Sequence, residues 1–230
     1  MWTDLAPAWQ ACLEEAWAAY VAGSVPIGAV VCDADGLIVA RGRNRIADPL
    51  PSADPGPRRP VAQHDLAHAE LNALLALPLS GWDKSLPNSP RQWALYTTIE
   101  PCPLCLGAFY MSGLRQLHYA ARDPYAGSVN LLGATPYLRV KPIRAAGPHP
   151  DLEPLCTAVC VEQLLRTNRA GRKDDLLDLW RQAVPAGAAL GERLHADHVL
   201  VSLQAARAPA AEMLAYVTAV QRQLATGPTT

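Results

Sequence analysis

The feature that most constrains this chain is a set of metal-type ligands divided between two distant segments. His68-Ala69-Glu70 supplies an imidazole and a carboxylate, and Pro101-Cys102-Pro103-Leu104-Cys105 supplies two thiols. Structural zinc sites use four protein ligands, whereas catalytic sites use three and leave a position for water. A fold that brings the two segments together would therefore bind zinc through one His and two Cys. Glu70 would be left to move protons.

The spacing within each segment predicts that the ligands lie at helix starts. Cys102 and Cys105 are three residues apart after Pro101, so they share one face of a first helical turn. His68 and Glu70 are two residues apart, which is about 200° around an α-helix. Both can reach one ion only if that ion lies beyond the helix N-terminus. Two helix N-termini at the ion would favour the thiolates and an ionised water.

Other cysteines and histidines leave alternatives to this ligand set. A closed structural site would need a fourth ligand from Cys12, Cys32, Cys156 or Cys160. Such a structural site needs no proton carrier, so it does not explain the Glu beside the His. His64, four residues before His68, is interpreted as a loop or capping residue. His195 and His198 lack a Cys or carboxylate partner at a convincing spacing, so we interpret them as surface or capping residues. Cys156 and Cys160 are four apart on an apolar helix face, which is typical of packing residues.

From residue 25 to about residue 169, the chain resembles the zinc-dependent cytidine deaminase superfamily. Within it, the chain is most similar to the branch of tRNA adenosine deaminases and bacterial guanine deaminases. The matching segments follow the family's order: Val25-Pro26-Ile27-Gly28-Ala29-Val30-Val31, Gly42-Arg43-Asn44, His68-Ala69-Glu70, residues 98–108 and Ala121-Arg122-Asp123. The resemblance implies a three-layer α/β/α domain with a mixed five-stranded sheet. It also implies one zinc ion per chain and hydrolytic release of an exocyclic amine as ammonia.

The resemblance assigns a role to each matching residue. The implied zinc ligands are His68, Cys102 and Cys105. Glu70 would shuttle protons, and the backbone amide of Ala69 would lie beside the target ring. Asn44 matches an Asn that hydrogen-bonds the base or nucleoside, although taken alone it is also typical of a turn after a strand. Asp123 matches a position where tRNA adenosine deaminases contact the nucleotide beside the target.

The chain departs from the family pattern in three places. The tRNA enzymes usually have Asp-Pro-Thr-Ala before the His, whereas this chain has His64-Asp65-Leu66-Ala67. A proline-rich stretch at residues 48–60 lengthens the connection before the catalytic helix. The residues after Arg169 match nothing in the short tRNA enzymes. We therefore divide the chain into a catalytic domain, residues 1–168, and a helical C-terminal extension, residues 169–230.

Hydrophobic periodicity predicts the elements of both parts. Predicted strands lie at residues 27–32 and 37–40, joined as a hairpin, and at 93–98 and 117–121. Predicted helices lie at residues 8–22, 69–77, 102–112 and 155–165. In the extension, residues 174–183 and 209–224 have helical periodicity, and the segment between them is interpreted as turns with Gly and Pro. We expect the extension to pack against the core or against a partner chain.

The charge and the cysteine content indicate the cellular compartment and the kinds of binding partner to expect. The formal net charge is −1, so there is no global basic field to attract nucleic acid. The sequence has neither a signal peptide nor an apolar run of about eighteen residues, so we expect no membrane association. Two of the six cysteines are assigned to zinc and the others lie in apolar segments. A reducing cytoplasm is the expected location, and we expect a homodimer.

The end of the predicted helix at residues 155–165 bears on RNA binding. The tRNA enzymes carry a Phe-rich, strongly basic terminus there, whereas this chain has Leu164 and Leu165. A modest basic cluster remains: Arg166, Arg169, Arg172 and Lys173. It would suit RNA phosphates, and it would equally suit a solvated helix end beside the C-terminal dipole.

The substrate is less constrained than the chemistry. Trp82 and Tyr125 lie on predicted loops and would either stack on a base or form surface clusters. We expect a small nucleobase or nucleoside of the guanine, adenosine or cytosine type. The alternative is a tRNA-specific adenosine deaminase that makes inosine at the wobble position. A third reading, an inactive zinc-binding subunit, is disfavoured because such a protein has no need of Glu70.

Overall fold

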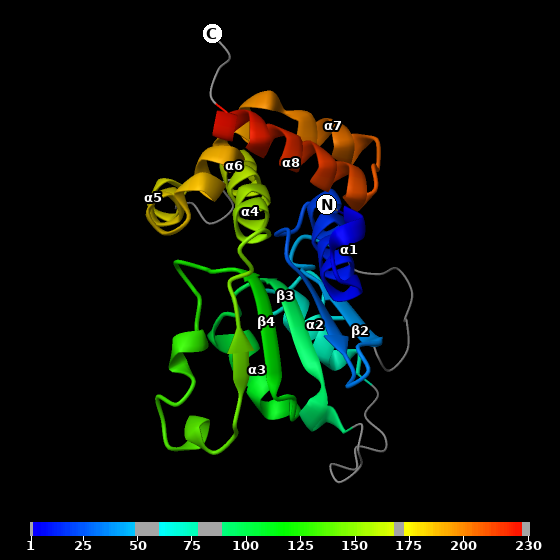
Figure 1. Cartoon of the computed structure of the whole chain (residues 1–230), viewed down its shortest axis with the longest axis vertical. Helices are drawn as coiled ribbons and strands as arrows, with labels where there is room; N and C mark the ends of the chain where they lie inside the picture. Colours follow the sequence, from blue (N-terminus) through cyan, green and yellow to red (C-terminus); the bar gives the residue numbers. More distant parts are fainter. Residues whose placement is uncertain (1, 49–59, 78–88, 168–172, 227–230) are drawn as a thin grey trace.

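The computed structural model describes residues 2–48, 60–77, 89–167 and 173–226, and its core is a five-stranded mixed sheet (Figure 1). The strands are β1 (Gly28–Cys32), β2 (Ile38–Arg43), β3 (Ala94–Ile99), β4 (Gln116–Ala121) and β5 (Arg144–Ala146). Their order is β2-β1-β3-β4-β5. β1 pairs antiparallel with β2 and β3, and β4 pairs parallel with β3 and β5. The predicted hairpin and mixed sheet are confirmed, and the short edge strand β5 is an addition.

Helices cover both faces of this sheet because β1 is apolar on both sides. Ala29 and Val31 face a core shared with α2 and α3, whereas Val30 and Cys32 face a core shared with α1 and α4. Successive strand residues point to opposite faces, so a fully buried strand needs two covering layers. The helices are α1 (Pro7–Val21), α2 (Ala69–Leu75), α3 (Pro103–Ser112) and α4 (Glu153–Thr167). The predicted three-layer architecture is confirmed.

Two glycines let these helices lie directly on the strands. A Cβ added at Gly28 would lie 2.1 Å from the carbonyl oxygen of Cys12 in α1. At Gly42, the added atom would lie 2.2 Å from the amide nitrogen of Ala73 in α2. Any larger residue at Gly42 would therefore push α2 away from the sheet, together with the His-Ala-Glu segment at its start.

The C-terminal part is helical, as predicted, and gathers at one end of the molecule (Figure 1). Its helices are α5 (Lys173–Ala183), α6 (Pro185–Asp197), α7 (Val199–Ala205) and α8 (Ala210–Thr226). Short 3₁₀ helices elsewhere lie at Trp2–Asp4, Pro90–Gln92, Val129–Leu131 and Tyr137–Arg139. None of the described helices combines the length and apolar character needed to cross a bilayer. The boundary proposed at residues 168 and 169 lies outside the described residues, so that division stays a prediction.

The turns expected between α5 and α8 are wrong, because this segment forms α6 and α7. Pro185 occupies the start of α6, where proline is well tolerated. Gly187 and Gly191 are contact residues rather than turn residues. A Cβ at Gly187 would lie 2.7 Å from Cβ of Thr157, and one at Gly191 would lie 2.6 Å from Cβ of Val161. The glycines thus allow α6 to cross α4 closely, which composition alone does not reveal.

Candidate metal centre

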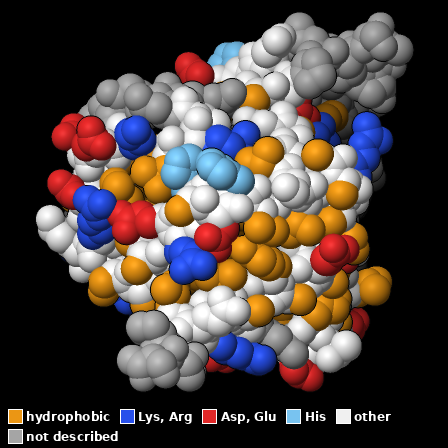
Figure 2. Space-filling view, turned by 90° about the horizontal axis from the view of Figure 1, so that it is seen from above, with side chains coloured by type: hydrophobic (Ala, Val, Ile, Leu, Met, Phe, Trp, Pro, Cys, Tyr) orange, Lys and Arg blue, Asp and Glu red, His pale blue; other side chains and the backbone are white. Residues whose placement is uncertain are grey.

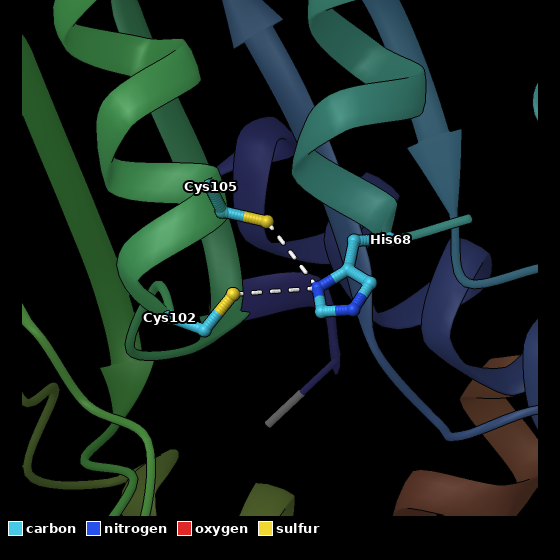
Figure 3. A group of neighbouring side chains, drawn as sticks. All are labelled: His68, Cys102 and Cys105. Carbon is cyan, nitrogen blue, oxygen red and sulfur yellow. Dashed lines mark hydrogen bonds between the residues drawn. The ribbon is translucent and has the colours of Figure 1, made fainter. Parts of the chain in front are cut away.

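The three candidate ligands lie on two neighbouring helix starts (Figure 3). His68 directly precedes α2, Cys102 directly precedes α3, and Cys105 lies in the first turn of α3. Nδ1 of His68 is 3.5 Å from Sγ of Cys102 and 3.4 Å from Sγ of Cys105. Figure 3 shows both sulfur atoms directed at the same ring nitrogen. The arrangement predicted from the spacing is therefore present.

The donor set fits a zinc ion. Zn–N bonds of about 2.0 Å and Zn–S bonds of about 2.3 Å in a tetrahedral site put the nitrogen about 3.5 Å from each sulfur. The observed distances of 3.5 and 3.4 Å match this value. Across the described residues, which include all six cysteines, the three side chains His68, Cys102 and Cys105 are the one group close enough to hold a metal ion. The closed four-ligand alternative is therefore wrong.

The two thiols are electrostatically unequal. The hydrogen bond from Cys105, helped by His68, lowers the pKa of the Cys102 thiol to about 4. The same contact between the sulfurs, together with burial, raises the pKa of Cys105. The hydrogen bond to Cys102 also raises the pKa of His68. The lowered pKa favours the thiolate form of Cys102, which is the form that binds metal.

Glu70 lies beside the ligands, and hydrogen bonds from Cys105 and Thr97 hold its carboxylate in place. Its side chain is 4% exposed. One carboxylate oxygen accepts a hydrogen bond from the Cys105 thiol at 3.3 Å, and the other accepts from the hydroxyl of Thr97 at 3.2 Å. Burial raises the pKa of Glu70 above its usual range. A buried carboxyl with a raised pKa, next to three metal ligands, is suited to accept and return a proton.

Asn44 lies in a turn that is bonded to the residues before α2, and Ala69 begins α2. Asn44 is 2% exposed, and its Oδ1 accepts a hydrogen bond from the backbone N–H of Ile46 at 3.2 Å. The next residue, Arg45, donates its backbone N–H to the carbonyl of Ala67. This bond fixes the Asn44 turn against the residues that lead into α2. Ala69 is the first residue of α2, where helix geometry leaves the amide N–H without an intrahelical partner.

Asp123 follows β4 and lies near Cys102. Its Oδ1 accepts hydrogen bonds from the backbone N–H groups of Tyr125 and Ala126, at 2.9 and 3.0 Å. Burial raises the pKa of the Asp123 carboxyl, with a smaller contribution from the charge of Cys102. Tyr125 is 58% exposed at the edge of this loop. Trp82, the other aromatic residue expected at a loop, lies outside the described residues.

Glu100 is a positioning residue that the sequence interpretation missed. One oxygen of its carboxylate accepts the backbone N–H of Val129 at 3.0 Å, and the other accepts that of Asp123 at 3.4 Å. A Cβ at Gly127 would lie 2.6 Å from this carboxylate. Glu100 therefore fixes the loop after β4 against the start of α3. In the sequence, Glu100 is marked only by the Glu-Pro pair that precedes Cys102. That pair does not indicate which groups the Glu100 carboxylate contacts.

The remaining histidines do not join the ligand group. Nδ1 of His64 accepts a hydrogen bond from the backbone N–H of Leu66 at 3.0 Å, so His64 is a loop residue that closes the turn before α2. His198 is exposed and joins α6 to α7 with a φ of 55°. His195 lies with its Nδ1 4.0 Å from the carboxylate of buried Glu162. The interpretation of these side chains as other than zinc ligands is consistent with the structure.

Arg166 of the basic cluster contacts buried groups of the protein. The guanidinium of Arg166 lies 4.8 Å from the centre of the Tyr20 ring and 3.6 Å from the carboxylate of Glu162. Lys173 begins α5, whereas Arg169 and Arg172 lie outside the described residues. Arg166 thus stabilises the junction of α1 and α4, and its charge is already paired.

Comparisons with known proteins agree with this site. Residues 4–121 match the family model of the cytidine and deoxycytidylate deaminase zinc-binding region. The chain is 34% identical over 118 residues to a tRNA-specific adenosine deaminase of Agrobacterium fabrum, a match covering 51% of this chain and 65% of that protein. It is 36% identical over 97 residues to a guanine deaminase of Bacillus subtilis, covering 42% of this chain and 50% of that protein. The chain thus matches between half and two thirds of the length of these two relatives.

A solved structure is also similar. It is described as a guanine deaminase from Nitrosomonas europaea, and it is 28% identical to this chain. The match covers 69% of this chain and 93% of that one, with a TM-score of 0.44.

Proposed function

Because the chain belongs to the cytidine and deoxycytidylate deaminase family, we propose that it is a zinc-dependent hydrolase that removes the exocyclic amine of a small nucleobase or nucleoside. The reaction consumes one water, replaces the ring amine by a carbonyl oxygen and releases ammonia. The observation that carries this proposal is a three-ligand group with a separate buried carboxyl beside it. A closed structural site would have no position for water and no use for Glu70.

Each residue of the centre has a proposed part in this reaction. His68, Cys102 and Cys105 hold the zinc, which when bound supplies Lewis-acid activation of water. Glu70 takes a proton from the attacking water and delivers it to the ring nitrogen. It then takes the second proton, from the hydroxyl group now on the ring carbon, and passes it to the amine, which leaves as ammonia while the hydroxyl oxygen becomes the carbonyl. The amide groups of Asn44 and Ala69 would orient the ring.

Several features favour a small substrate over RNA. RNA recognition needs positive charge for the phosphates and stacking surfaces for extruded bases. Here the net charge is −1, and Arg166 is already ion-paired. On the face at the helical end, acidic and basic side chains of the described residues are interspersed, and hydrophobic ones gather on one side (Figure 2). The similarity to a tRNA-specific adenosine deaminase keeps tRNA as the alternative substrate.

Ammonia release is the direct test of the function. Purified protein with about one zinc per chain is assayed against guanine, adenosine, cytosine, cytidine and a tRNA anticodon stem-loop. Cys102→Ser should lose both zinc and turnover. Glu70→Gln should keep zinc and thermal stability but lose at least about 10²- to 10⁴-fold in rate, because no other group shuttles protons. Wild-type rates in Glu70→Gln would refute the mechanism.

The same panel distinguishes RNA from a small molecule. Binding through phosphates weakens steeply with salt, by about 0.7 in log K per log salt for each phosphate neutralised on a single strand. We expect turnover of the small substrate to change little with salt. Replacing Arg169, Arg172 and Lys173 together, with Arg166 kept in its contacts with Glu162 and Tyr20, should also leave it nearly unchanged. Efficient inosine formation in the stem-loop, lost at high salt and in this threefold variant, would favour the alternative.

We also propose a homodimer in the cytoplasm. Four large apolar side chains are exposed on and beside α3: Leu104, Met111, Tyr137 and Val140. Met111 and Tyr137 contact each other, since the Tyr137 hydroxyl lies 2.9 Å from the Met111 sulfur. An exposed apolar group of this kind is typical of a protein interface. Light scattering should give twice the monomer mass, and Met111→Asp should give a monomer.

The cysteines support the proposed cytoplasmic location. None of the six is in a disulfide, which suits a reducing compartment.

A further inference from the structure

The end of β2 is fastened to α2, the helix that begins at the metal centre. A Cβ added at Gly42 would lie 2.2 Å from the amide nitrogen of Ala73, so the backbones of β2 and α2 are in direct contact there. Three residues later, Arg45 donates its backbone N–H to the carbonyl of Ala67 at 2.9 Å. Asn44 lies between these two contacts, so its turn has a set position relative to α2.

Asn72 of α2 adds a side-chain link to this contact. It is 3% exposed. Its amide nitrogen Nδ2 donates to the carbonyl oxygen of Arg43 at 3.2 Å and to that of Val61 at 3.0 Å. Its Oδ1 accepts the backbone N–H of Val61 at 2.8 Å. Both hydrogens of the amide and its oxygen are therefore bonded, and one of these bonds holds the residue directly before Asn44.

The same short helix carries the residues of the metal centre. His68 directly precedes α2, Glu70 lies in its first turn, and Asn72 donates its backbone N–H to the carbonyl of His68 at 3.0 Å. Any shift of the Asn44 turn relative to Asn72 is therefore also a shift relative to His68 and Glu70. An apolar residue at position 72 would fill the same space, but it could not select one arrangement of the backbone groups that the amide bonds.

We propose that Asn72 is a positioning residue of the deaminase site, which holds the Asn44 turn at the position relative to His68 and Glu70 that substrate binding requires. This proposal rests on the proposed function, in which the Asn44 amide orients the ring. Groups that bind a reacting molecule must be held to within about 0.5 Å by the residues around them. Because the Asn72 amide bonds backbone groups of the chain, it acts on the substrate only through Asn44.

Two substitutions at Asn72 test this role. Asn72→Asp keeps the acceptor for the Val61 N–H and removes both donated bonds, whereas Asn72→Ala removes all three bonds without adding a charge. The probes are guanine, adenosine, cytosine and cytidine. For the best of them, each variant should raise KM about 3- to 10-fold, the effect of one weakened hydrogen bond to the substrate. Zinc content and kcat should change little. A merely structural role would instead lower the folded fraction, and thus the apparent kcat, at an unchanged KM.

A double-mutant cycle with Asn44 shows whether the effect passes through the turn. Asn44→Ala should raise KM at least as much as Asn72→Ala does, because a displaced turn cannot lose more than the Asn44 contact supplies. The variant with both changes should have the KM of Asn44→Ala to within about twofold, because the positioning residue then has nothing to position. KM increases that multiply in the double variant would show that Asn72 acts independently of Asn44, and would overturn the proposal.

Gln204 of α7 provides the matched control. Its amide also donates to two backbone carbonyls, those of Tyr20 at 3.3 Å and Val21 at 3.0 Å, at the end of α1. Gln204→Glu should lower Tm, as Asn72→Asp should, but it should leave KM unchanged. The proposal fails if both Asn72 variants have the wild-type KM. It also fails if neither variant gives a folded, zinc-containing protein, because Asn72 would then be a folding residue.

Binding distinguishes this proposal from the deaminase function itself. If the wild type releases no ammonia from any of the four probes, the proposed function fails. Calorimetry then still measures the Kd of each probe for the wild type, Asn72→Ala, Asn44→Ala and the double variant. A Kd that rises in Asn72→Ala, and rises no further when this change is added to Asn44→Ala, supports the positioning role. Equal Kd values in the wild type and Asn72→Ala, or binding of no probe, contradict it.

Discussion

Replacing Gly191 of α6 by Ala should destabilise the chain, because α6 crosses α4 too closely for a methyl group. The added Cβ would lie 2.6 Å from Cβ of Val161 and 2.7 Å from the carbonyl oxygen of Ala158, whereas ordinary contact begins at 3.4 Å. The carbonyl belongs to the backbone of α4, so it cannot move by a rotamer change. The two helices must separate, and overpacking of this kind costs about 1–3 kcal/mol.

Helix propensity acts in the opposite direction and sets the net effect. Ala is better than Gly inside a helix by about 0.8–1.0 kcal/mol. The expected net loss is therefore about 0–2 kcal/mol. For chains of this size, about 1 kcal/mol shifts Tm by roughly 2–4 °C. Gly191→Ala should thus lower Tm by up to roughly 8 °C, measured by far-UV circular dichroism.

The matched control is the same substitution at Gly107 in α3. Within one chain, a Cβ there meets nothing within 4 Å. Both substitutions are compared in the Met111→Asp background, which removes the proposed interface on this face of α3, so only helix propensity changes at Gly107. Gly107→Ala should raise Tm by roughly 2–4 °C. Two identical substitutions in helices should thus have opposite signs. If Gly191→Ala raised Tm as Gly107→Ala does, the close crossing of α6 on α4 would be refuted.

Two further predictions concern buried polar groups. Thr97→Val should lower kcat about 10- to 100-fold with zinc content unchanged, since Thr97 donates to Glu70. The control Thr98→Val, which removes a bond to the Gly28 amide instead, should affect only stability, and equal kcat losses would disprove the role of Thr97. Burial raises the pKa of Glu162 above the ordinary 4.5. The protonated Glu162 carboxyl therefore contributes fully to stability below pH 4.5, and this contribution is lost as the pH rises through the pKa of the folded state. The Tm of wild type relative to Glu162→Gln should therefore fall as the pH rises above about 4.5, and a constant difference would exclude this linkage.

The metal centre could be predicted because its signals are local. His68 and Glu70 lie on one short segment and Cys102 and Cys105 on another, and the residue types alone specify soft ligands and a proton carrier. The sheet followed from short, continuously apolar segments such as β1, whose five residues are all buried. Each of these signals lies within a short stretch of sequence, so it can be recognised without knowing which distant residues are in contact.

The partners of the predicted residues could not be found in the same way. Thr97 donates to Glu70 across 27 positions, and Glu100 accepts from Val129 across 29. Neither has a spacing that marks it, because the contact depends on the register of the strands. Gly191 was misinterpreted for the same reason: a glycine in a turn and a glycine at a helix crossing are identical in composition. Only its position against α4 tells them apart.

The family match and the described fold differ in extent for the same reason. The match ends at residue 121, the last residue of β4, and it includes all three candidate zinc ligands. The helices from α4 onward lie beyond it. Local signals in the sequence therefore reach as far as the metal centre. The packing of the C-terminal helices depends instead on contacts between distant residues, such as Gly191 of α6 against Val161 of α4, and no pattern within either helix marks such a pair.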